Sequence, residues 1–259
     1  MTPTWLTQHD EDGIATVTIN HPPANTLTPQ GLMELESTLE ELAKNDRVKV
    51  IVITGTGRFF IAGADIRVLV DMDTSSKGRE MANTGQRIFH TIEAFPKPVI
   101  AAINGTCLGG GLELALCCHI RLAAEDIELG LPEINLGIIP GFGGTQRLPR
   151  IVGQSKATEL ILTGNSISAQ EARSLGLVSQ VFPPDDLMRH ATELARRIAS
   201  KGQMAVRAAL KALQQGLEPG FREELLLEAT LFGELCESED KQEGLAAFLE
   251  KRPPHFKNR

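Results

Sequence analysis

The sequence predicts an α/β fold, because strand-like and helix-like patterns alternate along most of its 259 residues. Residues 14–20 alternate apolar and polar side chains and end at two prolines, as expected of a strand that meets a chain break. Residues 28–45 repeat leucine at helical spacing, and Thr28 is the expected N-cap. Residues 48–54 form a nearly continuous apolar run, which is typical of a strand covered on both faces.

The alternation continues to about residue 182. The further expected elements are a strand end at 59–64 with Asp65 as a helix cap, a polar loop at 71–77, a helix at 78–94, a strand at 99–103, a glycine-rich turn from 104, a helix at 112–118, a strand at 120–123, a glycine-rich loop at 137–144 and a strand at 177–182. From Asp185 onward only amphipathic helices follow.

We therefore expect a core at residues 1–195 and a helical C-terminal region at 196–259. The last helices include apolar residues at 225–227, 231–232 and 246–249, which is more apolar surface than a small appendage can bury by itself. This surface predicts a subunit interface.

Composition narrows the function. Hydrophobic residues make up 42% and charged residues 23%, which is typical of a globular protein. Aromatic residues make up only 4% and the net charge is −7, so nucleic acid is a poor candidate ligand. No apolar run predicts a membrane span, and the N-terminus lacks a secretory signal pattern, so we expect a cytoplasmic protein.

Common catalytic and binding motifs are missing. The sequence has no dinucleotide-binding or mononucleotide-binding glycine pattern, no serine-hydrolase elbow and no paired histidine spacing for zinc. The four cysteines fall in no metal-binding spacing and lie among apolar neighbours, so we expect buried free thiols (Cys107, Cys117, Cys118 and Cys236).

Two glycine-rich loops are candidates for binding a negatively charged oxygen. Residues 61–65 and residues 104–113 each run from a strand end into a helix start, where backbone N–H groups lack helical partners. Two such donors converging on one oxygen would form an oxyanion hole. Each loop taken separately also fits a tight turn that caps a helix, so both interpretations stay open.

Two glutamates lie next to apolar residues in this part of the chain. Glu113 follows the second loop and has apolar neighbours, so we expect a semi-buried carboxylate suited to general acid or base chemistry. A first-turn Glu that complements the helix dipole is the alternative. Glu133 lies within an apolar segment punctuated by glycine and proline, which argues against a solvated surface charge.

Both loops and both glutamates lie in strings that resemble a known family. The strings at 62–66 (AGADI), 104–113 (NGTCLGGGLE), 131–133 (LPE) and 136–148 (LGIIPGFGGTQRL) resemble the crotonase family of enoyl-CoA hydratases and isomerases, closest to the bacterial-type short-chain enoyl-CoA hydratases. Further matching strings run in the same order from Pro22 to Arg252, so the resemblance extends almost end to end.

The resemblance implies a crotonase-like spiral of repeated ββα units, followed by a C-terminal helical region that mediates trimers or hexamers. It implies an oxyanion hole formed by the backbone N–H groups of Ala64 and Gly110. Glu113 and Glu133 match the two glutamates that hold water in hydratases of this family, with Gly141 near the second.

The resemblance also implies an acyl-CoA substrate, with coenzyme A as part of the substrate and no metal or other cofactor. The residues expected to contact it are Ala24, Ala62, Asp65, Ile66, Arg67, Gly109, Gly141, Phe248 and Lys251. Phe248 and Lys251 would reach the adenine from a neighbouring subunit, and both, like Arg67, have an alternative as ordinary surface or interface residues.

Two positions depart from relatives in the family. Leu131 replaces a glutamine found in some hydratases, and no lysine follows Pro22 and Pro23. The first departure removes a polar contact to Glu133, and the second removes a cation near coenzyme A.

The leading hypothesis is hydration of a short-chain or medium-chain enoyl-CoA, as in the β-oxidation of fatty acids. A Δ3,Δ2-enoyl-CoA isomerase is the alternative, and by family logic it needs the acid at 133 but not the acid at 113. Other acyl-CoA reactions of the family and a non-catalytic acyl-CoA or RNA-binding scaffold are further alternatives. The presence of both glutamates favours hydration.

Overall fold

Two sheets organise the chain. The computed structural model describes residues 3–201, 203–215, 229–230, 232–233, 236–252 and 254. The six-stranded sheet has the order β1 (Trp5–His9), β2 (Ile14–Ile19), β3 (Val50–Gly55), β5 (Val99–Ile103), β7 (Ile120–Ala124) and β10 (Gln180–Phe182). The four-stranded sheet has the order β4 (Phe59–Ile61), β6 (Thr106–Leu108), β8 (Glu128–Gly130) and β9 (Ser166–Ser168).

From β3 to β8, successive strands alternate between the two sheets, which confirms the predicted spiral of ββα units. β3 and β4, β5 and β6, and β7 and β8 each contribute one strand to each sheet before the chain becomes helical. The pairs β3–β5, β5–β7, β4–β6 and β6–β8 are all parallel, as expected when each turn of the spiral repeats the direction of the turn before it. The antiparallel pairs are β1–β2 and β8–β9.

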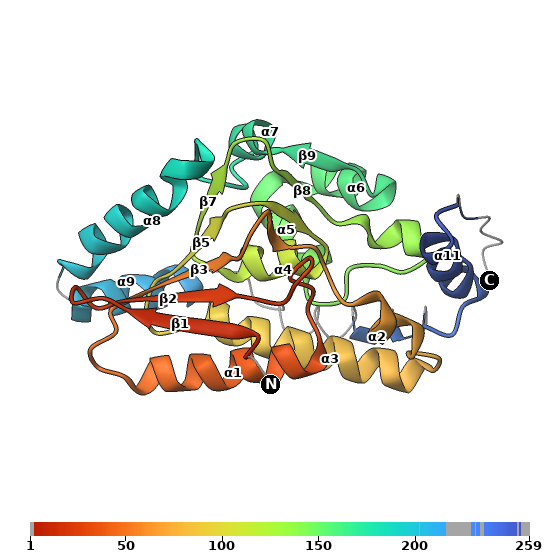
Figure 1. The fold of residues 1–259 in the computed structure, drawn as a ribbon, viewed down its shortest axis with the longest axis horizontal. Helices are drawn as coiled ribbons and strands as arrows, with labels where there is room; N and C mark the ends of the chain where they lie inside the picture. The colour runs from red at the N-terminus through yellow and green to blue at the C-terminus, as the bar shows by residue number, and fades with distance from the viewer. Residues whose placement is uncertain are drawn as a thin grey trace.

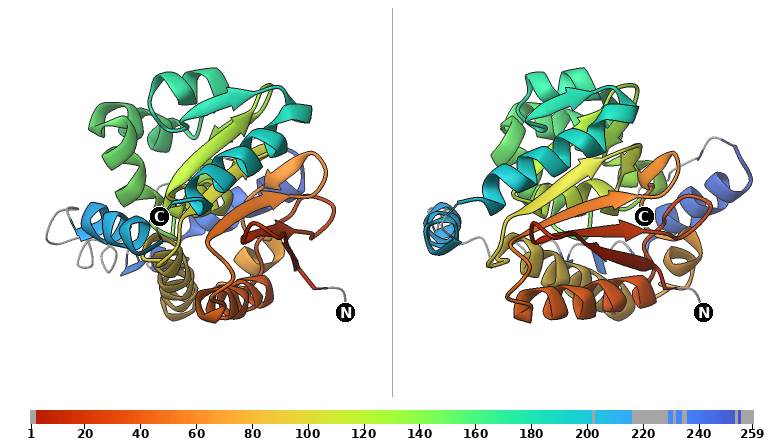
Figure 2. Two further views of the ribbon diagram at one scale, coloured as in Figure 1. Left: turned by 90° about the vertical axis from the view of Figure 1, so that its left-hand side faces the viewer. Right: turned by 60° about the vertical axis from the view of Figure 1, so that its left-hand side comes forward.

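The helices fill the connections and cover the sheets (Figure 1). They are α1 (Pro29–Lys44), α2 (Ile66–Val70), α3 (Ser75–Glu93), α4 (Gly110–Cys117), the 3-10 helix η1 (Pro132–Leu136), α5 (Gly144–Val152), α6 (Gln154–Thr163), α7 (Ala169–Ser174), α8 (Pro184–Ala199), α9 (Gln203–Gln215) and α11 (Glu239–Leu249). α8 packs across the six-stranded sheet, from β2 to β10 (Figure 2). None of the helices within the described ranges has the length and apolar character needed to cross a lipid bilayer.

Helix caps follow the predictions. The Thr28 hydroxyl accepts a hydrogen bond from the Gly31 N–H at 3.0 Å and so caps α1. The Asp65 carboxylate accepts from the Arg67 N–H at 2.9 Å and caps α2. Both caps satisfy N–H groups that have no partner within the helix.

Several expected boundaries were wrong. The expected loop at 71–77 is partly helical, because Thr74 caps α3 and its polar first turn begins at Ser75. The glycine-rich turn also becomes helical earlier than expected, since α4 begins at Gly110. The strand expected at 177–182 is only β10, because the N–H groups of Leu177 and Val178 bond to the Ala172 carbonyl in the turn after α7. Strand β1 was not expected from the sequence.

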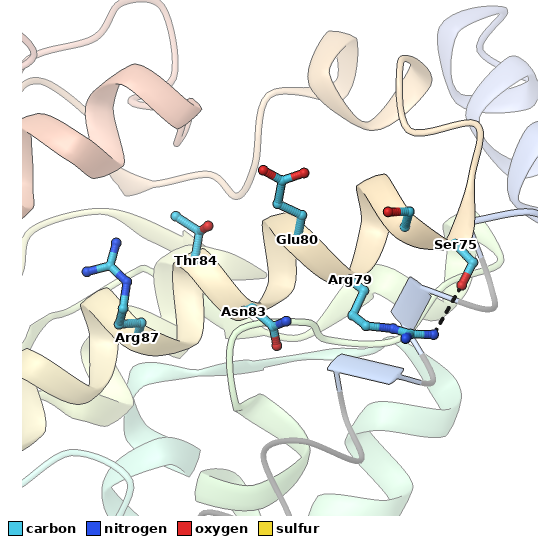
Figure 3. Close-up of a pocket in the computed structure, with 7 residues that line it drawn as sticks. Ser75, Arg79, Glu80, Asn83, Thr84 and Arg87 are labelled. Carbon is cyan, nitrogen blue, oxygen red and sulfur yellow. Dashed lines mark hydrogen bonds between the residues drawn. The ribbon is translucent and has the colours of Figure 1, made fainter.

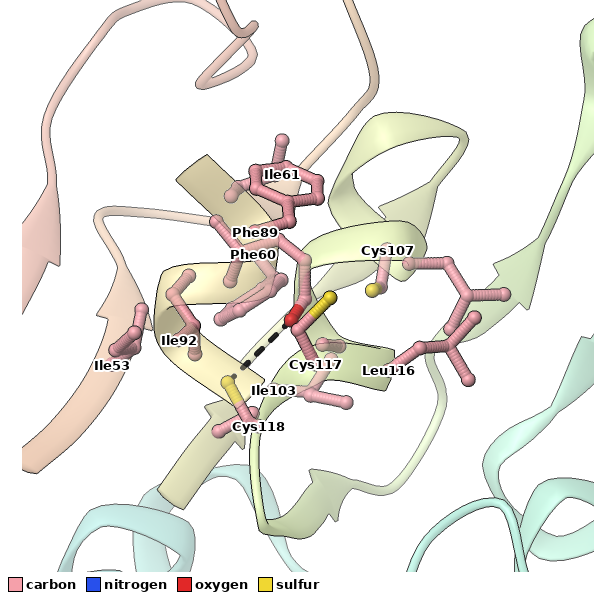
Figure 4. Packing of buried hydrophobic residues seen from close by; sticks show 14 of the residues in the cluster. Ile53, Phe60, Ile61, Phe89, Ile92, Ile103, Cys107, Leu116, Cys117 and Cys118 are labelled. Carbon is pink, nitrogen blue, oxygen red and sulfur yellow. Dashed lines mark hydrogen bonds between the residues drawn. The ribbon is translucent and has the colours of Figure 1, made fainter. Parts of the chain in front are cut away.

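One continuous core joins the two sheets (Figure 4). Ile53 and Ile103 come from the six-stranded sheet and Phe60 from the four-stranded sheet, and all are fully buried. They pack with Phe89 and Ile92 of α3 and with three of the cysteines. All four cysteines are buried free thiols, as predicted.

The C-terminal part that the structure describes is helical, as expected after residue 185. The expected boundary at 195 falls within α8, so the division into 1–195 and 196–259 stays a prediction. Of the expected interface residues, 225–227 and 231 lie outside the described residues. Phe232 is buried, whereas Phe248 and Leu249 are exposed.

Candidate active site

Glu113 lies in a cradle of backbone donors. The side chain projects from the first turn of α4 and is only 2% exposed, so it is more deeply buried than expected. Its Oε1 atom accepts hydrogen bonds from the N–H groups of Phe142 and Gly144, each at 2.8 Å. Two backbone donors on one carboxylate oxygen stabilise its charged form. Glu113 is therefore held in the deprotonated form that a general base requires.

Glycine provides the room for this cradle. A Cβ atom on Gly144 would lie 3.1 Å from Glu113 Oε1 and 3.0 Å from Leu131 Cδ1. Leu131 itself is fully buried. The residue that departs from some relatives therefore packs against the backbone that holds Glu113.

Glu133 lies beside the loop that leads into α4. It occupies the first turn of η1, and its Oε2 atom is buried. A Cβ atom on Gly109 would lie 2.8 Å from Glu133 Oε1. The Gly109 carbonyl also accepts the N–H of Glu113 at 3.0 Å, at the start of α4. The structure thus brings both predicted carboxylates to the same glycine-rich loop.

The two predicted oxyanion-hole residues lie on adjacent loops. Leu27 forms a parallel bridge with Ala64 through the Gly63 carbonyl and the Asp65 N–H, so the Ala64 N–H points away from Leu27. Gly110 is the first residue of α4, where N–H groups have no helical acceptor. A Cβ atom on Gly109 would lie 3.6 Å from Gly63 Cα, which shows how closely the two loops approach.

The residues expected to contact coenzyme A surround this loop pair. The Ala62 N–H donates to the Ala24 carbonyl at 3.2 Å. Arg67 forms a two-point ion pair with Asp65, with distances of 3.1 and 2.8 Å. The hydrogen bond from Arg67 lowers the pKa of Asp65. The Arg67 side chain is 85% exposed and Ile66 is half-buried, so both lie at the rim.

Phe248 and Lys251 lie at the end of α11, which packs against η1 and α2 of the same chain (Figure 1). The buried Lys241 ammonium donates to the Met72 carbonyl, and Gly244 lies against the Leu136 backbone. These anchors hold α11 to its own chain, and the expectation that Phe248 and Lys251 reach the adenine of a neighbouring subunit stays a prediction. Both residues are exposed.

Several polar groups near Glu113 were missed by sequence reasoning. The turn at 141–144 supplies the two N–H groups that donate to Glu113, although Gly141 was expected near Glu133. The Gly141 carbonyl accepts a hydrogen bond from Gln86 Nε2 at 3.0 Å. The Phe142 carbonyl accepts from Arg147 Nη1 at 2.9 Å. A polar side chain on the apolar face of α3 is the sequence signal that identifies Gln86.

A separate open pocket of about 530 Å³ lies on the outward face of α3 (Figure 3). Its described lining includes Arg79, Asn83 and Arg87 but none of the predicted site residues. Within the described ranges, no group of three or more His, Cys, Asp or Glu side chains is placed to hold a metal ion.

Comparisons with known proteins give one consistent family. The family model described as enoyl-CoA hydratase/isomerase matches residues 9–259. A probable enoyl-CoA hydratase of Bacillus subtilis is 50% identical over 245 residues, covering 94% of this chain and 95% of that protein. A crotonyl-CoA hydratase of Syntrophomonas wolfei is 43% identical over 248 residues, covering 95% of each chain. The solved structure of an enoyl-CoA hydratase from Bacillus anthracis is 40% identical, covers 99% of this chain and 100% of that chain, and has a TM-score of 0.80.

Proposed function

This chain belongs to the enoyl-CoA hydratase/isomerase family, and we propose that it adds water across the 2,3 double bond of a trans-2-enoyl-CoA to give the 3-hydroxyacyl-CoA. The observation on which this rests is the pair of carboxylates around one glycine-rich loop, with Glu113 held by two backbone N–H groups. By family logic an isomerase needs Glu133 but not Glu113. The two backbone hydrogen bonds that hold Glu113 therefore favour hydration.

The backbone N–H groups of Ala64 and Gly110 form the oxyanion hole in this proposal. Addition at C3 moves negative charge onto the thioester oxygen, and preorganised donors stabilise that charge in the transition state. A single donor of this kind contributes about 3 kcal/mol in comparable sites. The close approach of the Gly63 and Gly109 loops supports the assignment.

Glu113 and Glu133 divide the proton transfers. The water oxygen bonds to C3 as Glu113 accepts a water proton, and the electron pair of the double bond shifts toward the thioester to form an enolate. Glu133 then delivers a proton to C2 and the thioester carbonyl re-forms. Proton exchange returns Glu113 to its charged form and Glu133 to its acid form, so that water is the only group added.

The coenzyme A part of the substrate follows the rim of the site. We assign its contacts to Ala24, Ala62, Asp65, Ile66, Arg67, Gly109, Gly141, Phe248 and Lys251. Arg67 is a cation suited to meet a phosphate, because its side chain is 85% exposed although its partner Asp65 is buried. No other cofactor takes part in the proposed reaction.

We also propose a test substrate and an oligomeric state. Crotonyl-CoA is a suitable test substrate, because a 43% identical relative is a crotonyl-CoA hydratase. The exposed Leu213, Phe248 and Leu249 support self-association into a trimer or hexamer through the C-terminal region. A role in β-oxidation and a cytoplasmic location stay predictions from the sequence.

Loss of the conjugated enoyl-thioester absorbance with crotonyl-CoA tests the proposal. We expect fast hydration that falls to a slow residual rate in Glu113→Gln and in Glu133→Gln. Glu128→Gln, a change of an exposed glutamate on β8, is the matched control and keeps the activity. Retention of a chain on immobilised RNA at moderate salt, without hydration, would favour the scaffold alternative.

The isomerase alternative gives a different result. It predicts no hydration of crotonyl-CoA, together with conversion of a 3-enoyl-CoA to the conjugated 2-enoyl-CoA. That conversion would depend on Glu133 and persist in Glu113→Gln.

A further inference from the structure

Gln86 is a buried polar side chain on α3, in a helix whose inward face is otherwise almost entirely apolar. It is 5% exposed, and its Nε2 donates to the Gly141 carbonyl, 55 residues later in the chain. Gln86 follows the pocket-lining residues Asn83 and Arg79 of Figure 3 by one and two helical turns, so it lies on the edge of the buried face of α3 next to that pocket. A buried amide costs free energy unless it is hydrogen-bonded, so its direction is fixed by its partners.

One peptide group joins Gln86 to Glu113. The Gly141 carbonyl and the Phe142 N–H belong to the same planar trans peptide unit, and they point in opposite directions. Gln86 holds the oxygen of this unit at 3.0 Å, and Glu113 Oε1 accepts its N–H at 2.8 Å. Hydrogen bonds arranged in a chain polarise one another, so donation to the carbonyl strengthens the N–H as a donor.

The rest of the turn is held at both of its following carbonyl groups. The Gly143 carbonyl, which shares a peptide group with the Gly144 N–H, accepts the N–H groups of Gln146 and Arg147 at 3.1 and 2.9 Å. Arg147 donates to the Phe142 carbonyl, and its guanidinium pairs with Glu93 at 3.0 Å. Burial raises the pKa of Glu93, but hydrogen bonds from His90 and Arg147 and the charge of Arg147 outweigh it and lower that pKa overall. Glu93 is therefore charged and keeps the buried Arg147 in place.

The Phe142 ring completes the restraint. It packs edge-on against Phe89 with ring centroids 5.4 Å apart, and it occupies the space over Gly85, where a Cβ atom would come within 2.3 Å of the ring. The turn at 141–144 is thus fixed by the Phe142 ring and by the carbonyl groups of Gly141 and Phe142.

We propose that Gln86 is a positioning residue for Glu113, acting through the peptide group between Gly141 and Phe142. It aims the Phe142 N–H at the carboxylate and keeps Glu113 ready to accept the proton of the attacking water. The inference rests on the proposed function, because it concerns the base of that reaction.

Gln86→Met tests the inference, because methionine has similar length but cannot donate to the Gly141 carbonyl. We expect kcat for crotonyl-CoA hydration to fall by about 10-fold to 100-fold with KM within about two-fold, as for loss of an interaction that acts on the chemical step. Gln170→Met, which changes an exposed glutamine on α7, is the matched control and leaves both constants unchanged. Gln86→Glu presents an acceptor to the Gly141 carbonyl and should lower kcat at least as much.

A double variant separates positioning from simple destabilisation. If Gln86 acts through Glu113, Gln86→Met should lower the residual rate of Glu113→Gln by less than about two-fold. An equal loss in both backgrounds would show a general structural role and overturn the inference. Wild-type kcat in Gln86→Met, with activity lost in Glu113→Gln, would overturn the inference alone. Full hydration by Glu113→Gln would overturn the proposed function itself.

Discussion

Replacing Gly109 by alanine should move Glu133 and damage catalysis more than it damages stability. The new Cβ atom would lie 2.8 Å from Glu133 Oε1, and ordinary van der Waals contact begins near 3.4 Å, so the oxygen must retreat by about 0.6 Å. A misplacement on the order of 1 Å can cost about 100-fold in rate, so we expect kcat to fall by about 10-fold to 100-fold.

The same change also strains the backbone. Gly109 has φ +52° and ψ −127°, a conformation that costs a residue with a side chain about 1–3 kcal/mol. For a chain of this size, that strain corresponds to a loss on the order of 2–12 °C in Tm. The activity loss must therefore be compared with a variant that has strain alone.

Gly176→Ala is that matched control. Gly176 has φ +75°, but a Cβ atom there would meet nothing within 4 Å. Both variants are assayed by crotonyl-CoA hydration and thermal unfolding, and we expect a similar loss of Tm but a loss of kcat only in Gly109→Ala. Wild-type kcat in Gly109→Ala would refute the placement of Glu133 at the reacting carbons.

Two further predictions concern buried titratable groups. His119 accepts the Val99 N–H through Nδ1 at 2.9 Å, and burial lowers its pKa; the unfolded chain therefore binds a proton that the folded chain does not, and stability falls as pH drops below about 6.5. Thermal unfolding between about pH 5 and pH 7 should show a shallower slope in His119→Gln, and an unchanged slope would contradict the assignment. Burial raises the pKa of Cys118 to about 12 and raises those of the other three cysteines, so the native protein should resist Ellman's reagent at about pH 8 until it is denatured. Rapid reaction of the native thiols would show that they are accessible.

The fold could be predicted where apolar residues alternate or form a long continuous run. β2 and β3 follow the apolar patterns of residues 14–20 and 48–54 closely. The strands β6, β8 and β9 have only three residues each, too few for a pattern, and their pairing depends on the neighbouring turns of the spiral. The start of α3 was misjudged because a capped, exposed first turn has the polar composition of a loop.

The candidate site was predictable only in part. Glu113 and Glu133 could be identified because acids among apolar residues are unusual. Their surroundings could not, because the donors to Glu113 lie 29 and 31 residues away and are backbone N–H groups, which have no sequence signature. Gln86 is 55 residues from its acceptor, so spacing along the chain gave no reason to pair them.

The positions of the charged groups divide the site into a rigid centre and an adaptable rim. Around Glu113, the Phe142 N–H is fixed through the bond of Gln86 to the Gly141 carbonyl, and the Gly144 N–H through the bonds of the Gly143 carbonyl at the start of α5. Moving either donor would leave polar atoms unsatisfied at a cost of about 1–3 kcal/mol each. At the rim, the Arg67 side chain is 85% exposed, so its guanidinium can turn toward a phosphate while Asp65 keeps its bond from the Arg67 N–H. Reacting atoms require fixed geometry, whereas the long, charged end of the proposed substrate must enter and leave at every turnover. The rigid and the mobile charges therefore lie where the proposed reaction needs them.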